Sequence, residues 1–146
     1  MDPELYPPVS PAEWDAFHTI REGVLWRERG LADGYDCRHP DDAAAGNHPL
    51  LLTDAGRPIG VVRVDIDGSV AYLRRVAVIA EVRGMGYGSA MLALAEQFAA
   101  ARGAVIVRSN VDAGAVGFYR RAGYVERGPT LADGGVPMEK RVSGEG

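Results

Sequence analysis

Three glycines within five residues, Gly84, Gly86 and Gly88, constrain this chain more than any other feature of its sequence. They lie between an apolar strand predicted to end at Val78 and an amphipathic helix predicted to follow. Glycine adopts backbone conformations that other residues avoid, so several N–H groups of such a turn can point into one concavity. The helix N-terminus adds partial positive charge, and Arg83 adds a full one. The segment therefore predicts a turn that binds an anion.

The glycine turn allows other interpretations besides anion binding. A glycine-rich turn can also be no more than a tight connection between two elements. A dinucleotide-binding turn needs its third glycine three residues after the second, where this chain has Ser89, and the preceding strands look antiparallel. A nucleotide P-loop needs a lysine followed by serine or threonine, which this turn lacks. Anion binding and a plain connection therefore stay open.

The segments before the turn predict a helix and then a strand meander. Ser10, Pro11 and Glu13 form a helix start, with a serine cap and a glutamate that closes a capping box. Apolar residues recur at helical spacing as far as Gly30, and Gly23 can divide this helix in two. A long loop without periodicity then leads to three strands, predicted to be consecutive and antiparallel, at residues 50–53, 59–66 and 70–78.

The segments after the turn complete an α/β pattern. One helix presents an apolar stripe that Gly103 can terminate, formed by Met91, Leu92, Ala95, Phe98 and Ala99. A short strand is expected at residues 105–107, and a second helix runs from Ala115 to Ala122, ended by Gly123. Tyr124 begins the last predicted strand. Helices and strands therefore alternate through the second half of the chain.

Length and charge exclude several classes of function. At 146 residues the chain is expected to form one domain, residues 1–146. Its net charge is −4 with basic residues spread along the chain, so no nucleic-acid-binding surface is expected. The single cysteine, Cys37, cannot form an internal disulfide, and no zinc-ligand spacing is present. No apolar run approaches the roughly 20 residues that span a bilayer. We expect a cytoplasmic protein that binds neither metal nor membrane.

At this point the sequence resembles the GNAT superfamily of acyl-CoA-dependent N-acyltransferases. The family's pyrophosphate loop has the pattern Arg/Gln-x-x-Gly-x-Gly/Ala, which Arg83, Gly86 and Gly88 match. The apolar residues before the loop and a later block also resemble the family, namely Val76, Ala77, Val78, Ala115, Phe118, Tyr119, Gly123 and Tyr124. Two motifs in the right order are more specific than either alone.

The resemblance implies a fold and an activity. The fold is α/β, with a mixed, mostly antiparallel central sheet that splays open between the strand ending at Val78 and the strand near Val105, flanked by helices. The activity is N-acetyl transfer, with acetyl-CoA or coenzyme A bound at the loop and direct transfer to an amine in a ternary complex. The acceptor, a small-molecule or peptide amine, stays unidentified, and the sequence leaves a homodimer open. A non-catalytic acyl-CoA-binding module or sensor is the alternative.

The resemblance also implies a set of site residues. Asn110 lies five residues before Ala115, whereas the family often has asparagine three residues before its equivalent, where this chain has Asp112. A backbone N–H near Val78 is expected to face the thioester carbonyl, and Tyr119 is the expected acid that protonates the leaving thiolate. The cofactor-binding set is Val76, Ala77, Val78, Arg83, Gly84, Met85, Gly86, Tyr87, Gly88, Ser89, Asn110, Phe118 and Tyr119.

Several side chains keep two interpretations each. Tyr119 lies on a helical stripe, so it is either the catalytic acid or a core tyrosine. Trp26 either lines an acceptor pocket or packs in the core. The candidate bases are Asp65, Asp67 and Glu81, each of which can equally be a solvated surface acid. The acids of the loop at residues 31–49, among them Asp36, Asp41 and Asp42, either hold a cationic acceptor or belong to a solvated turn.

Overall fold

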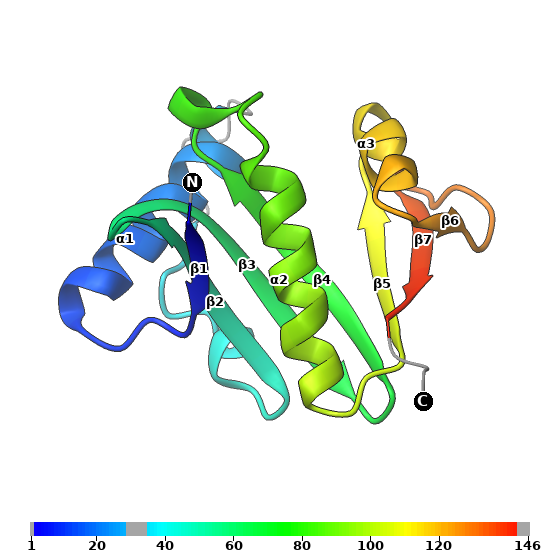
Figure 1. Ribbon diagram of the computed structural model, residues 1–146, viewed down its shortest axis with the longest axis horizontal. Helices are drawn as coiled ribbons and strands as arrows, with labels where there is room; N and C mark the ends of the chain where they lie inside the picture. Colours follow the sequence, from blue (N-terminus) through cyan, green and yellow to red (C-terminus); the bar gives the residue numbers. More distant parts are fainter. Residues whose placement is uncertain (1, 29–34, 143–146) are drawn as a thin grey trace.

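The computed structural model describes residues 2–28 and 35–142, which form one mixed sheet with helices on both faces (Figure 1). The strand order is β1-β2-β3-β4-β5-β7-β6. The strands are β1 (Pro3–Tyr6), β2 (Asn47–Asp54), β3 (Arg57–Asp67), β4 (Val70–Val78), β5 (Ile106–Val111), β6 (Val125–Glu126) and β7 (Val136–Arg141). The helices are α1 (Pro11–Glu22), α2 (Tyr87–Ala101) and α3 (Val116–Arg121). None of the helices in the described ranges is long and apolar enough to cross a membrane.

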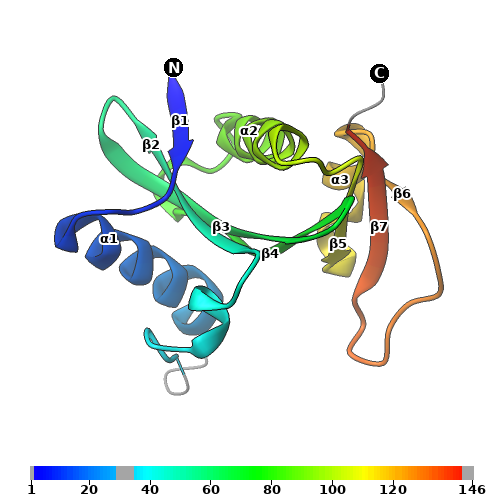
Figure 2. The same ribbon diagram turned by 90° about the horizontal axis from the view of Figure 1, so that it is seen from below.

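The helices cover the two faces of the sheet separately. Figure 2 shows α1 on one face of β2, β3 and β4 and α2 on the opposite face, with α3 beside β5. Phe17 and Ile20 of α1 pack against Val61 and Ala77, whereas the apolar stripe of α2 packs against alternate residues of the same strands. Because both faces are covered, residues 50–53 of β2 are buried at every position.

The sheet splits between β4 and β5. These two strands pair in parallel only as far as Leu73 and Ser109, while every other pair of neighbouring strands in the described sheet is antiparallel. Beyond this point residues 74–78 of β4 have no β5 partner. Arg75 has a positive φ of 55° at a register shift that bulges and bends β4. The mixed, mostly antiparallel fold and its split are therefore confirmed.

Two strands of the sheet, β1 and β7, were not predicted from sequence. β1 lies in the proline-rich N-terminal segment and pairs with β2, and β7 lies between β5 and β6 although it follows both in sequence. Both are formed by pairing with strands that are distant in sequence, so no local pattern marks them. The strand predicted to begin at Tyr124 is the short β6, which forms one edge of the sheet.

Two predicted strands were too short. β2 begins at Asn47 rather than at residue 50 and includes Pro49. Proline is tolerated there because β1 reaches only as far along β2 as Leu51, so the missing N–H faces no neighbouring strand. β5 runs from Ile106 to Val111 and does not end at residue 107. Its polar second half is held by β7, which pairs with it along its full length.

The start of α1 confirms the predicted capping box. The N–H of Glu13 donates to Oγ of Ser10 at 3.1 Å, and the N–H of Ser10 donates to Oε1 of Glu13 at 3.0 Å. Backbone hydrogen bonds from Ser10 and Val9 lower the pKa of Glu13. The α-helix ends at Glu22, and a π-helical turn at Gly23–Arg27 follows, so the helix divides at glycine as predicted. The predicted end at Gly30 lies outside the described residues.

Replacement of Ser10 by alanine is expected to lower the free energy of unfolding by about 1 kcal/mol. The variant removes the acceptor for the Glu13 N–H while leaving the buried face of α1 intact. Chemical denaturation monitored by circular dichroism measures the change. Ser69→Ala is the control, because Ser69 lies exposed in the turn between β3 and β4. An equal loss in both variants would remove the capping box as a stabilising feature.

Candidate active site

A cavity of about 780 Å³ opens at the point where β4 and β5 part. β4 forms one wall, the end of β5 with α3 forms the facing wall, and the π-helical turn after α1 contributes Val24, Leu25 and Trp26. Most of the residues singled out in the sequence line this cavity, namely Val76, Ala77, Val78, Arg83, Gly88, Asn110, Phe118 and Tyr119. The two sequence motifs therefore meet in space at the split of the sheet.

The backbone of β4 directs hydrogen-bonding groups toward this cavity. Ile79 donates its N–H to the carbonyl oxygen of Ile59 at 2.9 Å, and bonding direction alternates along a strand. The N–H and C=O groups of Val76 and Val78 therefore point away from β3, toward the side on which β5 has parted. Such a strand edge can pair with a ligand that carries amide groups of its own.

The glycine turn connects this strand edge to α2. Gly84 and Gly86 have φ angles of 80° and 91°, in the region that favours glycine, and Gly86 caps the N-terminus of α2. The first N–H groups of a helix have no partner within it, so this end of α2 can bind an anion. Gly88 is constrained differently, because a Cβ there would lie 3.2 Å from Cζ of Phe118. Glycine at that position allows α2 and α3 to approach each other beside the cavity.

Arg83 lines the cavity and contacts both β4 and the residue that follows the π-helical turn. Its Nε–H donates to the carbonyl oxygen of Val78 at 3.0 Å, and its guanidinium lies 2.8 Å from the carboxylate of Glu28. The side chain is 44% exposed. The positive charge predicted beside the glycine turn is thus present and accessible, with Glu28 as its counter-ion.

Tyr119 extends from α3 into the cavity wall. Its side chain is buried, with 6% of its surface exposed, and its ring meets those of Phe118 and Tyr124 edge-on. Burial raises the pKa of the Tyr119 hydroxyl, and a hydrogen bond with the Ser109 side chain partly lowers it again. The phenol therefore stays protonated at neutral pH. Tyr119 therefore packs in the core and also lines the cavity.

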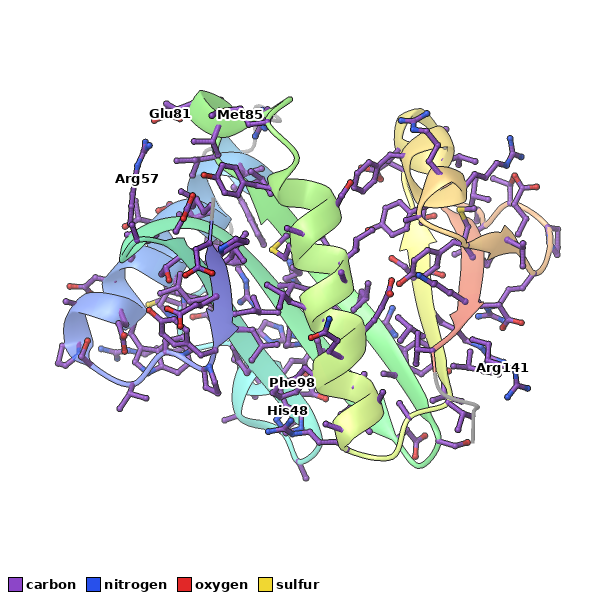
Figure 3. All side chains as sticks on the ribbon, in the orientation of Figure 1. His48, Arg57, Glu81, Met85, Phe98 and Arg141 are labelled. Carbon is purple, nitrogen blue, oxygen red and sulfur yellow. The ribbon has the colours of Figure 1, made fainter. Side chains whose placement is uncertain are left out.

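Some residues of the predicted set do not line the cavity. Met85 is exposed and lies at the outer end of the turn (Figure 3). The side chain of Tyr87 is buried on the other side of the turn, where its hydroxyl donates to the carboxylate of Asp54. Ser89 lines a second, smaller cavity of about 220 Å³ between α2 and α3. Gly84 and Gly86 do not line the larger cavity either, so anion binding at residues 84–87 and 89 depends on backbone N–H groups.

None of the candidate bases lines the cavity within the described residues. Asp65 is ion-paired with Arg63 at 2.7 Å, and Glu81 lies exposed at the outer end of the molecule (Figure 3). Asp67 lies at the exposed far end of β3. The carboxylate that does line the cavity belongs to Asp112, which directly follows β5.

The acids of the long loop do not reach the cavity either. Asp36 accepts the backbone N–H of Arg38 at 2.8 Å, and Asp41 is exposed at a short 3-10 helix, Pro40–Ala43. Asp42 accepts two hydrogen bonds from one nitrogen of buried Arg21, at 2.9 and 3.0 Å. Burial opposes its ionisation, but the charges and hydrogen bonds of nearby arginines lower the pKa of Asp42 overall. Asp36, Asp41 and Asp42 therefore do not line the cavity, and their role in holding a cationic acceptor stays a prediction that the structure does not support. Residues 31–34 lie outside the described chain.

Sequence reasoning missed Arg75, which lines the cavity from the bulge of β4. The signal for it was present, because Arg74 and Arg75 are adjacent and interrupt the alternation expected of a strand. Trp26 also lines the cavity, and its ring lies beneath the Arg75 guanidinium with 5.0 Å between Cζ and the ring centroid. Trp26 therefore lines the cavity, and its role in binding the acceptor stays a prediction.

Comparisons with known proteins agree with this fold. The sequence model of the acetyltransferase (GNAT) family matches residues 10–124. A protein from Lactobacillus plantarum that carries a provisional assignment as an N-acetyltransferase is 26% identical, with a TM-score of 0.80 over 98% of this chain and 100% of that chain. An aminoglycoside 6'-N-acetyltransferase solved with coenzyme A is 15% identical, with a TM-score of 0.81 over 100% and 99% of the two chains. The PaiA N-acetyltransferase from Thermoplasma acidophilum, also solved with coenzyme A, is 18% identical, with a TM-score of 0.74 over 97% and 99%.

Proposed function

Since the chain belongs to the acetyltransferase (GNAT) family, which moves acyl groups from acyl-CoA to amines, we propose that it acetylates an amine by direct transfer in a ternary complex. The chain is an N-acetyltransferase, and acetyl-CoA is its co-substrate. The observation that carries the proposal is the split between β4 and β5, because it opens one cavity to groups from both motifs. Direct transfer needs both substrates to meet at such a point.

The residues around the split fit coenzyme A. The outward-facing N–H and C=O of Val76 match the amides of pantetheine, which can pair with them as an added strand does, whereas the Val78 carbonyl already accepts from Arg83. The positive-φ glycines, the N-terminus of α2 and the accessible Arg83 match a pyrophosphate. We assign the pyrophosphate to the backbone of residues 84–89, with Phe118 and Asn110 along the facing wall.

Each protein group near the acyl carbon has a proposed role. When bound, acetyl-CoA supplies an acetyl group activated as a thioester. We assign the N–H of Val78 to the acyl carbonyl oxygen, where negative charge develops as the amine attacks. We assign the Tyr119 hydroxyl to the departing sulfur, because it lines the cavity and burial, which raises its pKa, keeps it protonated at neutral pH.

The position of the cysteine supports direct transfer over an acyl-enzyme. Cys37 is the only cysteine of the chain, and it is exposed in the loop before the 3-10 helix rather than in the cavity lining. A cysteine relay needs its sulfur beside the acyl carbon. We assign the acceptor to the part of the cavity lined by Val24, Leu25 and Trp26, a lining that does not include Cys37. The amine then attacks the thioester directly.

Turnover with a panel of amines tests the proposed function. The panel contains aliphatic amines, amino acids, polyamines, aminoglycosides and peptides with free N-termini, each incubated with acetyl-CoA. Thiol release and the mass of the acetylated product are the two readouts. We expect acetylation of at least one class and no thiol release when the amine is omitted. Binding of acetyl-CoA without acetylation of any amine would favour a non-catalytic binding module or sensor.

A further inference from the structure

Arg75 is a charged side chain that the transfer chemistry does not use. It sits on the β4 bulge in a positive-φ conformation, which is strained for a residue with a side chain. The conformation brings the guanidinium to the α1 side of the sheet, over Trp26 and into the lining of the cavity. Within residues 2–28 and 35–142, Arg75 makes no ion pair and no side-chain hydrogen bond. Its five donors are therefore available to a ligand.

The surroundings of Arg75 are positively charged. Partial burial, followed by the charges of Arg21 and Arg63, lowers the pKa of Arg75. Arg21, Arg63 and Arg75 form a cluster of positive charge. Two carboxylates face it, those of Asp42 and Asp65, and both already pair with arginines. Asp42 lies 2.9 Å from Arg21 and 3.5 Å from Arg63, and Asp65 lies 2.7 Å from Arg63. Two nitrogens of Arg21, Nε and Nη2, are buried without a hydrogen-bond partner in the described chain. Within the described residues, the cluster therefore holds three arginines and two carboxylates and keeps a net positive charge.

Tyr35 and His18 lie beside the arginine cluster and add no negative charge to it. Burial raises the pKa of Tyr35 to about 12, so its phenol is neutral, and the phenol hydrogen-bonds to the ring of His18. Burial and the Arg21 charge lower the pKa of His18, so its imidazole is neutral at pH 7. Tyr35 packs edge-on against Trp26, with ring centroids 4.7 Å apart. Aromatic rings thus form an apolar wall next to an unpaired guanidinium.

We propose that the acceptor is a small amine that carries a carboxylate near its amino group, and that Arg75 binds this carboxylate against Trp26. The inference rests on the proposed function and names the substrate class for the same cavity. A planar guanidinium binds a carboxylate through two parallel hydrogen bonds, which an acceptor without a carboxylate cannot form. The same positive field favours the neutral form of the amine, which is the form that attacks. An acceptor with further ammonium groups is repelled.

Matched acceptors test this proposal directly. Each amino acid of a small set, for example phenylalanine, leucine and methionine, is compared with its amide and with the amine that lacks the carboxyl group. kcat/KM is measured from thiol release at saturating acetyl-CoA. We expect the amino acid to exceed its amide about tenfold or more, the range of one charge-assisted hydrogen-bonded pair.

Variants of the two adjacent arginines identify the residue responsible. Arg75→Gln is expected to lower kcat/KM for the amino acid about tenfold, to leave the amide within about twofold, and to leave acetyl-CoA affinity unchanged. Arg75→Lys should restore part of the preference, because it keeps the charge and loses the paired geometry. Arg74→Gln is the matched control. Arg74 lies on the same strand, pairs with Asp65 at 3.7 Å and lies outside the cavity lining. It should retain the preference.

The outcomes separate failure of this inference from failure of the proposed function. Amides or decarboxylated amines that react faster than the amino acids would overturn the assignment of the acceptor while leaving the acetyltransferase intact. A parallel loss of acetyl-CoA affinity in Arg75→Gln would place Arg75 in the co-substrate site and overturn it too. Acetyl-CoA binding without acetylation of any amine would reject the proposed function and this inference with it.

Discussion

Replacement of Gly86 by glutamate is expected to weaken acetyl-CoA binding by at least about 100-fold. Gly86 caps the N-terminus of α2 with φ at 91°, next to the N–H groups to which the pyrophosphate is assigned. A carboxylate there would compete for the same N–H groups. It would also repel the phosphates by about 4 kcal/mol for each pair of unit charges 4 Å apart near a protein surface. Isothermal titration calorimetry with acetyl-CoA measures the loss.

Two control variants isolate the charge from the backbone strain. Gly86→Ala adds strain at the same φ without a charge, so we expect a smaller loss of affinity than with glutamate. Gly56→Glu introduces the same charge at φ 82° in the β2–β3 turn, outside the cavity lining, and acetyl-CoA affinity should be retained. Circular dichroism confirms that each variant is folded. A folded Gly86→Glu protein with wild-type affinity would move the co-substrate site elsewhere.

The Tyr119→Phe variant is expected to lower the single-turnover rate about 100-fold at neutral pH, with acetyl-CoA affinity retained. The change removes one hydroxyl and keeps the buried ring with its edge-on contacts to Phe118 and Tyr124. A thiolate is a fairly good leaving group and water can partly replace the acid, so the loss stays at the low end for a general acid. Single-turnover measurement keeps slow product release from hiding the chemical step.

The pH dependence gives this variant a second readout. Burial raises the pKa of Tyr119, so the wild-type acid keeps its proton through neutral pH and loses it only above the ordinary value of about 10. The wild-type advantage should therefore be constant near neutrality and shrink only in strong alkali. Tyr124→Phe is the control, because Tyr124 is a buried tyrosine that donates to Glu96 at 2.9 Å and lies outside the cavity lining. A Tyr119→Phe rate equal to wild type at every pH would leave Tyr119 as a packing residue.

Local patterns were sufficient to predict the elements that carry the two motifs. The capping box at Ser10, the division of the helix at Gly23 and β4 at Val70–Val78 all follow from residues a few positions apart. The glycine turn is equally local, since positive φ at Gly84 and Gly86 depends on the absence of a Cβ. Strands without such a pattern, β1 and β7, escaped prediction because they are completed by partners distant in the chain.

The identity of the side chains in the cavity was decided by the tertiary structure. Tyr87 and Ser89 belong to the glycine motif, yet packing directs Tyr87 to Asp54 and Ser89 to a separate cavity. Asp42, which the sequence offered as a contact for a cationic acceptor, pairs with Arg21, which lies 21 residues earlier in α1. Charge pairing of this kind depends on which segments the fold brings within about 4 Å, and sequence spacing carries no such information.

The sequence by itself therefore determined the strand meander and the glycine turn, and its resemblance to the GNAT family pointed to Tyr119 as the candidate acid. The meander and the turn depend on backbone preferences and apolar spacing, which act over short stretches of chain. Only the tertiary structure decided that Arg75 faces the cavity without a carboxylate partner among residues 2–28 and 35–142. A bulge between β3 and β4 turns Arg75 toward Trp26, while the acids nearby are held by Arg21 and Arg63. The loop acids had suggested a cationic acceptor, whereas Arg75 leads us to propose one that carries a carboxylate. The difference arises because ion pairs depend on distances in the folded chain.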